Sequence, residues 1–91
     1  MFEYTLFHRL PVWSQVEVLT RKGNLLSQRY HKDYTISLYH LDHYFVEVWS
    51  RGGLRISTSF REDAKAIAIL EPYLDNPEIQ KLLEKLLDLE S

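Results

Sequence analysis

Tyr34–Phe60, with the sequence YTISLYHLDHYFVEVWSRGGLRISTSF, decides the fold of this chain. Apolar and polar residues alternate in three runs, over residues 34–40, 43–50 and 54–60. This period of two is typical of β-strands that have one buried face. The stretch therefore predicts an antiparallel meander of three strands.

Both faces of this meander carry large apolar side chains. The face that we expect to pack on the core holds Ile36, Leu38, Tyr44, Val46, Val48, Ile56 and Phe60. The opposite, outer face holds Tyr39, Phe45 and Trp49. A small domain has to cover such a second face with its own chain, with another copy of itself or with a ligand. Which of these it uses decides the function.

Strand register predicts the lengths of the loops. A three-residue loop over residues 51–53 places Val48 opposite Ile56, whereas a loop of two glycines mixes apolar and polar residues on both faces. We therefore expect the three-residue loop, with Gly53 left-handed and a bulge. The same parity argument predicts an odd-length loop over residues 41–43.

Helical spacing predicts a helix before the meander. The segment that starts at Val12 or Trp13 and ends at Lys22 carries apolar residues near helical spacing and is followed by Gly23, placed where a helix cap needs positive φ. The β-branched residues Val16 and Val18 favour a strand instead. Residues 25–30 are typical of an edge strand that joins the meander.

Two further helices are expected after the meander. Residues 63–70 contain small residues suited to packing on a sheet, and Pro72 ends or bends this helix. Asn76 and Pro77 are a strong helix start. The helix that follows has an apolar stripe made of Ile79, Leu82, Leu83, Leu86 and Leu87. We expect the stripe to pack on the core, with a partner helix as the alternative.

Length and composition indicate one globular domain. The 91 residues are 45% hydrophobic and 26% charged, values that favour neither disorder nor a membrane protein. We divide the domain into an N-terminal segment, 1–11, that forms a strand or an arm, a core, 12–75, and a C-terminal amphipathic helix, 76–91. The expected class is α+β: a three- to four-stranded antiparallel meander with an N-terminal helix and two C-terminal helices, packed mainly on one face.

Charge and cysteine usage narrow the function classes. The net charge of −2 divides into +3 over residues 1–61 and −5 over residues 62–91, so the sheet half is mildly basic. Without cysteine there is no disulfide, thiolate metal site or thiol nucleophile. The first residues lack the pattern of a secretory signal and no apolar run is long enough to span a bilayer. We expect a cytoplasmic protein.

A weak metal or catalytic candidate lies between two predicted strands. His40, Asp42 and His43 fall within four residues, and imidazole and carboxylate groups suit zinc. No fourth ligand is evident, and Asp is common in turns for backbone reasons. No partner nucleophile or oxyanion loop accompanies the group. We therefore expect no enzyme activity, no cofactor and no metal.

The outer face is the stronger candidate for binding. Its aromatic residues Tyr39, Phe45 and Trp49 are flanked by Arg29, Arg51 and Arg55. Aromatic rings beside guanidinium groups on an open sheet are how some domains stack bases and hold phosphates. Glu47 lies in the same row, where it would repel a phosphate backbone. Cover by the N-terminal segment or the first helix is the competing interpretation.

One further pattern is a resemblance. Residues 38–49, LYHLDHYFVEVW, followed by a glycine turn and a final strand, resemble small uncharacterised bacterial domain proteins. In those proteins a Trp-containing helix, a glycine and an LYxL…YFVEVW-like hairpin recur over the region matching residues 12–75. The resemblance implies a bacterial domain and brings no activity, cofactor or site residue.

The sequence therefore predicts a non-catalytic protein-interaction or self-associating module, expected as a homodimer. Such a module buries Phe45 and Trp49 or offers them to another protein. The alternative is single-stranded nucleic-acid binding through the same aromatic face. No membrane partner is expected, because the polar face of the last helix is acidic.

Overall fold

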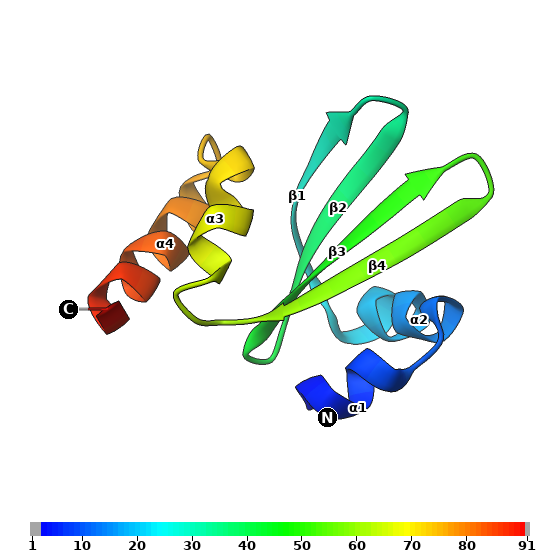
Figure 1. The fold of residues 1–91 in the computed structure, drawn as a ribbon, viewed down its shortest axis with the longest axis horizontal. Helices are drawn as coiled ribbons and strands as arrows, with labels where there is room; N and C mark the ends of the chain where they lie inside the picture. The colour runs from blue at the N-terminus through cyan, green and yellow to red at the C-terminus, as the bar shows by residue number, and fades with distance from the viewer. Residues whose placement is uncertain (1–2, 91) are drawn as a thin grey trace.

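One antiparallel sheet forms the centre of the computed structural model, which describes residues 3–90. Within these residues, helices α1 (Tyr4–Arg9) and α2 (Val12–Lys22) precede the sheet. The strands are β1 (Asn24–His31), β2 (Tyr34–Leu41), β3 (Tyr44–Arg51) and β4 (Leu54–Arg61), in the spatial order β1-β2-β3-β4. The sheet is followed by α3 (Ala66–Leu70), the short 3-10 helix η1 (Glu71–Tyr73) and α4 (Pro77–Glu90) (Figure 1).

The predicted α+β class is confirmed, with a sheet of four antiparallel strands and helices on either side of it in the chain. The N-terminal segment, expected as a strand or an arm, instead contains the helix α1. Its Tyr4 and Phe7 both pack against Tyr44, which their i, i+3 spacing on a helix allows. Residues 1–2 and 91 of the predicted domain lie outside the described residues.

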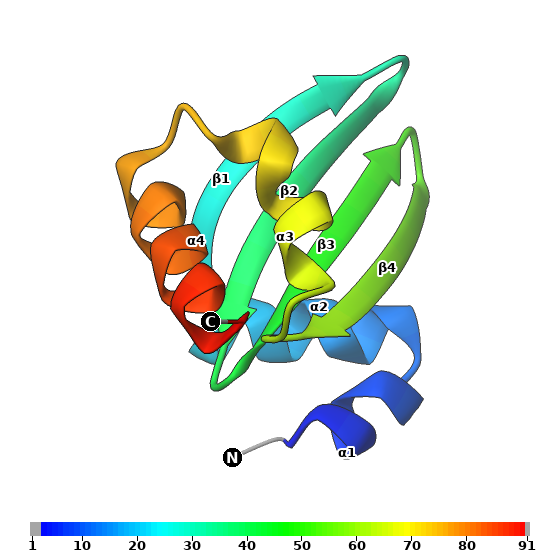
Figure 2. The same ribbon diagram turned by 60° about the vertical axis from the view of Figure 1, so that its left-hand side comes forward.

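Helices cover both faces of the sheet rather than mainly one, as Figure 2 shows. Helices α1 and α2 pack on the face that carries Tyr44, Val46 and Val48, here called the N-helix face. Helices α3 and α4 pack on the face that carries Phe45, here called the C-helix face. Every residue of β3 from Tyr44 to Val48 is therefore buried. A continuous buried run of this kind is typical of a strand that is covered on both sides.

The predicted odd-length loops are wrong. All three hairpins have two-residue loops, because His31 pairs with Tyr34, Leu41 with Tyr44 and Arg51 with Leu54. The first loop residue has positive φ in each case, 55° at Lys32, 53° at Asp42 and 58° at Gly52. Primed hairpin turns use such conformations, whose twist matches that of the strands.

The loops differ from the predicted lengths because the sheet does not have one apolar and one polar face. With two-residue loops, Trp49 pairs with Ile56, and Val48 pairs with Ser57. A helix layer on each side makes apolar residues acceptable on both faces. As a consequence, the residues assigned to one predicted face are divided. Ile36, Leu38, Ile56 and Phe60 share the C-helix face with Phe45 and Trp49, whereas Tyr39 shares the N-helix face with Val46.

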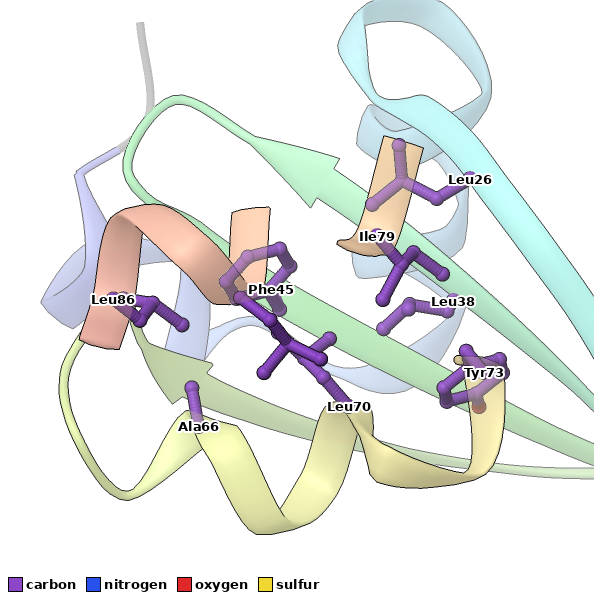
Figure 3. Close-up of a cluster of buried hydrophobic side chains, with 9 residues drawn as sticks. Leu26, Leu38, Phe45, Ala66, Leu70, Tyr73, Ile79 and Leu86 are labelled. Carbon is purple, nitrogen blue, oxygen red and sulfur yellow. The ribbon is translucent and has the colours of Figure 1, made fainter. Parts of the chain in front are cut away.

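The larger buried cluster lies between the sheet and the C-terminal helices (Figure 3). Its residues are Leu26, Leu38, Phe45, Ala66, Leu70, Tyr73, Ile79, Leu83 and Leu86. Three positions of the α4 stripe, Ile79, Leu83 and Leu86, are thus core residues, as predicted. Each fully buried Leu or Ile contributes about 1.5–3 kcal/mol, so this layer is a main source of stability.

Gln15 ties the N-terminal helices to the sheet. It is buried, its Nε2 donates to the carbonyl oxygen of Phe7 at 3.0 Å, and its Oε1 accepts from the hydroxyl of Ser57. One amide therefore links α1, α2 and β4. A buried amide is tolerated because both of its ends are paired.

Gly23 ends α2, but not through the left-handed conformation that we predicted. Its φ is −80°, and its backbone N–H donates to the carbonyl of Leu19 at 2.9 Å. A Cβ at this position would lie 2.8 Å from that carbonyl oxygen. Glycine is needed here for close approach rather than for positive φ.

Asn76 begins α4 as predicted. Its Oδ1 accepts from the backbone N–H of Glu78 at 2.9 Å, and its Nδ2 donates to the carbonyl of Leu26 at 2.7 Å. The cap therefore also holds the start of α4 against β1. No helix within residues 3–90 has the length and apolar content to cross a membrane.

Candidate interaction surface

The C-terminal helices leave the far end of the C-helix face open. They pack over Leu38, Phe45 and Phe60, and the β1–β2 and β3–β4 hairpins project beyond them (Figures 1 and 2). Leu54 is 61% exposed and Ile56 is 53% exposed on this projecting part. The half-buried Trp49 lies beside Ile56 as its cross-strand partner. We call Trp49, Leu54 and Ile56 the distal patch.

Trp49 is held in place by its neighbours. The guanidinium carbon of Arg29 lies 5.5 Å from the centre of the indole ring. Tyr34 and His31 contact the ring in edge-on geometry, with centroid distances of 5.6 and 6.1 Å. Arg51 in turn lies 5.1 Å from the ring centre of Tyr34. Cation–π contacts of this kind contribute about 0.5–2 kcal/mol each and fix the orientation of the ring.

Beneath this array lies a buried carboxylate. Glu47 is 6% exposed, and its Oε2 accepts a hydrogen bond from the hydroxyl of Tyr73 at 2.5 Å. A nitrogen of Arg29 lies 3.6 Å from the same oxygen. Burial and the hydrogen bond to Glu47 raise the pKa of Tyr73, so the phenol stays a donor at neutral pH. The carboxylate of Glu47 therefore pairs with Tyr73 and Arg29 inside the protein and does not face solvent.

Strand β4 also offers backbone hydrogen-bonding groups. It is an edge strand, so it pairs with β3 on one side only. In a two-residue hairpin the residues that flank the loop exchange hydrogen bonds, and every second residue of each strand then points its N–H and C=O away from the partner strand. In β4 these outward residues are Arg55, Ser57, Ser59 and Arg61.

Helix α1 covers one end of this edge. The hydroxyl of Tyr4 donates to the carbonyl of Ser59 at 3.1 Å, and His8 Nδ1 lies 2.8 Å from the Ser59 hydroxyl oxygen. The Ser59 carbonyl is an outward group, as the hairpin geometry requires. Arg55 and Ser57 lie nearer the turn, where α2 adjoins β4: the Ser57 hydroxyl donates to Gln15, and Val12 and Trp13 line a depression with Arg55.

The structure divides the five predicted binding residues. Trp49 and Arg51 lie on the projecting part of the C-helix face. Phe45 lies on the same face but is 0% exposed beneath the C-terminal helices, stacked on Phe60 with a centroid distance of 5.4 Å. Tyr39 and Arg55 lie on the opposite face, where Tyr39 packs against the N-terminal helices. The predicted row of Tyr39, Phe45 and Trp49 on one outer face is therefore wrong.

The weak metal candidates are not brought together. His40 stacks on Phe45, and its Nε2 lies 3.5 Å from a carboxylate oxygen of Glu62. Asp42 and His43 are exposed in the β2–β3 turn. Among residues 3–90, no group of three or more His, Asp or Glu side chains is placed to hold a metal ion.

Asp42 and His43 instead border a surface depression of about 390 Å³, together with Tyr4, Tyr44 and Arg61 among others. Burial and the charge of Asp42 raise the pKa of Tyr44 to about 12. Arg61 lies 4.4 Å from the ring centre of Tyr4. The depression is thus lined by packed aromatic and charged groups, and the phenol of Tyr44 is neutral at physiological pH.

A second open apolar region is the groove between α3 and α4. It has a volume of about 730 Å³, and its lining includes Ile67, Leu74 and Leu87. Glu71 and Glu84 lie in the same lining and make it acidic. The groove is therefore an alternative place for a protein partner, on the helical layer rather than on the sheet.

Sequence reasoning placed Arg29 beside the aromatic face but missed Leu54, Ile56 and Tyr34 as surface residues around Trp49. The signal that finds them is the loop length. A two-residue Gly52-Gly53 loop puts Leu54 and Ile56 on the same face as Trp49, and the short Lys32-Asp33 turn does the same for Arg29 and Tyr34.

Comparison of this chain with protein-family models, with curated proteins and with solved structures found no match.

Proposed function

We propose that this chain is a non-catalytic protein-interaction module that binds an extended polypeptide through the distal patch and the adjoining edge of β4. The main observation behind this proposal is that Leu54 and Ile56 are 61% and 53% exposed on an edge strand. The backbone groups of Arg55 and Ser57 in this strand point away from β3. Addition of a strand to such an edge combines main-chain hydrogen bonds with side-chain contacts. Trp49 provides the aromatic anchor that interfaces favour.

The polar groups near the patch support a binding role. Glu47 pairs with Tyr73 and Arg29 inside the protein, and Arg29 contacts the ring of Trp49. These contacts make the surface around Trp49 rigid. A rigid, preformed anchor lowers the entropic cost of association.

Selection from a library of short random peptides tests this proposal. Selected peptides should shift the amide NMR signals of residues 54–58 and the indole signal of Trp49. Ile56→Lys should abolish their binding, while Tyr30→Lys should retain it, because Tyr30 is 79% exposed on the other edge strand. Peptides that bind instead between α3 and α4, and are lost with Leu87→Lys, would overturn the proposal.

A second candidate function is single-stranded nucleic-acid binding. It is supported by Arg29 beside Trp49 and Arg51 beside Tyr34, which place guanidinium groups next to rings on one surface. It ranks second because Phe45 is buried and Tyr39 lies on the other face. Quenching of Trp49 fluorescence by a mixed-sequence oligonucleotide, weakened by salt, would favour this candidate. Absence of quenching at low salt would remove it.

The homodimeric state, the cytoplasmic location and the bacterial source all stay predictions.

A further inference from the structure

We propose that the polypeptide bound at the distal patch is a second copy of this chain. In this arrangement β4 pairs antiparallel with β4 of the second copy, about a two-fold axis at Ile56, and joins the two sheets into one. The inference rests on the proposed function for the use of this surface. It adds the identity of the partner and the register of the pairing.

Strand β4 is the more open of the two edges. Its pairing with β3 is regular from Leu54 to Arg61, with no bulge to twist it away. The other edge strand, β1, has a register shift between Leu25 and Ser27, and Asn76 donates a hydrogen bond to the carbonyl of Leu26. Proteins protect edges with bulges, prolines and covering elements. Between Leu54 and Thr58, β4 has no bulge and no proline, and the contact of Gln15 with Ser57 lies on the N-helix face of the strand.

The outward groups allow three two-fold registers near the open end of β4. Centring on Arg55 places the two Arg55 side chains directly opposite each other, which is repulsive. Centring on Ser57 requires the backbone of Ser59 to pair with Arg55 of the second copy, but Tyr4 already occupies the Ser59 carbonyl. Centring on Ile56 pairs Arg55 with Ser57 of the second copy and avoids both conflicts.

The Ile56 register also matches side chains on the C-helix face. Ile56 lies opposite Ile56 of the second copy, and Leu54 lies opposite Thr58. Because Trp49 is the cross-strand neighbour of Ile56, the two isoleucines lie between the two indole rings. The exposed apolar side chains of the distal patch are then covered by their own counterparts, as an isologous interface requires.

The ends of the pairing fit as well. Beyond Thr58, the residue opposite Ser59 is Gly53 of the second copy. A Cβ at Gly52 or Gly53 would meet no atom within 4 Å, so there is space on the side-chain side of this turn. A turn without side chains can lie beside Tyr4 of α1, which covers Ser59. The pairing therefore extends over residues 54–58 and stops where α1 begins to cover the edge.

The interface is small. Five residues from each strand bury less than the roughly 1,200–2,000 Å² of a stable protein–protein interface. We therefore expect a dimer in dynamic exchange, with dissociation in the micromolar range or weaker, so that monomer and dimer are both populated at accessible concentrations.

Single cysteine variants test the register, because the chain has no cysteine of its own. In a non-hydrogen-bonded antiparallel pair the Cα atoms lie about 4.5 Å apart, within the range that a disulfide spans. Ile56→Cys should therefore form a covalent dimer on mild oxidation. Thr58→Cys should not, because its symmetry mate is displaced by four residues, roughly 13 Å along the strand. Mixing Leu54→Cys with Thr58→Cys should give the mixed disulfide in preference to either homodimer.

Circular dichroism and the sedimentation of the unmodified chain accompany the cross-linking. At least a several-fold excess of covalent dimer for Ile56→Cys over Thr58→Cys, in folded protein, supports the inference. Equal rates, or faster cross-linking of Tyr30→Cys on β1, would overturn it. An unmodified chain that is monomeric at millimolar concentration would also overturn it. If selected peptides still bind at β4 in that case, the proposed function survives and only the identity of the partner fails.

Discussion

The hydroxyl of Tyr73 donates a hydrogen bond of 2.5 Å to Oε2 of Glu47, in the layer between the sheet and the C-terminal helices. This bond joins η1 to β3 and places a buried carboxylate beneath the Arg29–Trp49 pair. A charge in this position is tolerated only because donors surround it. The stability of the C-terminal layer and the orientation of Trp49 therefore depend on one another.

Tyr73→Phe should lower the free energy of unfolding by about 1–3 kcal/mol, because it leaves a buried carboxylate oxygen with one donor fewer. Urea denaturation measures the change. The matched control is Tyr30→Phe, which removes a hydroxyl from a side chain that is 79% exposed and should change stability by less than about 0.5 kcal/mol. Equal effects of the two substitutions would contradict the role given to the Tyr73–Glu47 bond.

Gly23→Ala should destabilise the fold by about 1–3 kcal/mol, since the added Cβ lies 2.8 Å from the Leu19 carbonyl oxygen and the end of α2 has to shift. Gly53→Ala is the control, because a Cβ there meets nothing within 4 Å. Thermal unfolding should separate the two variants clearly. An unchanged melting temperature for Gly23→Ala would show that the close approach is easily relieved.

Asn76→Ala should cost about 1–2 kcal/mol, because the α4 cap is lost together with the bond to the Leu26 carbonyl. Asn24→Ala, at an exposed position where β1 begins, serves as the comparison and should have little effect. Amide exchange should locate the loosening at the first turn of α4. Loosening elsewhere in the molecule, with α4 unaffected, would argue against the cap.

Stability should fall between about pH 10 and pH 12. The pKa of Tyr44 is raised from 10.0 to about 12 by burial and by Asp42, and that of Tyr73 is raised in the same direction. In this range the unfolded chain loses the phenolic proton and the folded chain keeps it, so rising pH favours unfolding. Below pH 10 the phenols are protonated in both the folded and the unfolded chain, so their contribution to the free energy of unfolding is fully present. Tyr44→Phe should reduce the slope of unfolding free energy against pH, and an unaltered slope would refute the assignment.

Local patterns in the sequence were sufficient for the strands and for the later helices, but not for α1, where a strand or an arm was expected. The strand alternation, the Asn76-Pro77 start and the stripe from Ile79 to Leu87 each depend on neighbouring residues, and the corresponding strands and helices are present. The length of the turn at Gly52-Gly53 was harder to predict, because it was inferred from an assumption about which face of the sheet is apolar. That inference required knowledge of the helix layers, which is tertiary information.

The candidate site was only partly predictable for the same reason. Trp49 and Arg51 were identified and lie near the surface, whereas Phe45 is buried by α3 and α4, far away in the sequence. Tyr39 changed faces with the shift in register. Burial of one aromatic and exposure of another depends on where the helices end over the sheet, and no local pattern encodes that boundary.

Hydrogen exchange of the outward amides of β4 tests the central claim most directly. The amides of Arg55 and Ser57 should exchange more slowly as the protein concentration rises from about 10 μM to about 1 mM, the range in which a small interface forms. The outward amides of Gln28 and Tyr30 on β1 should show no such dependence. Exchange at Arg55 and Ser57 that is independent of concentration, or protection that appears on β1 instead, would contradict association through β4.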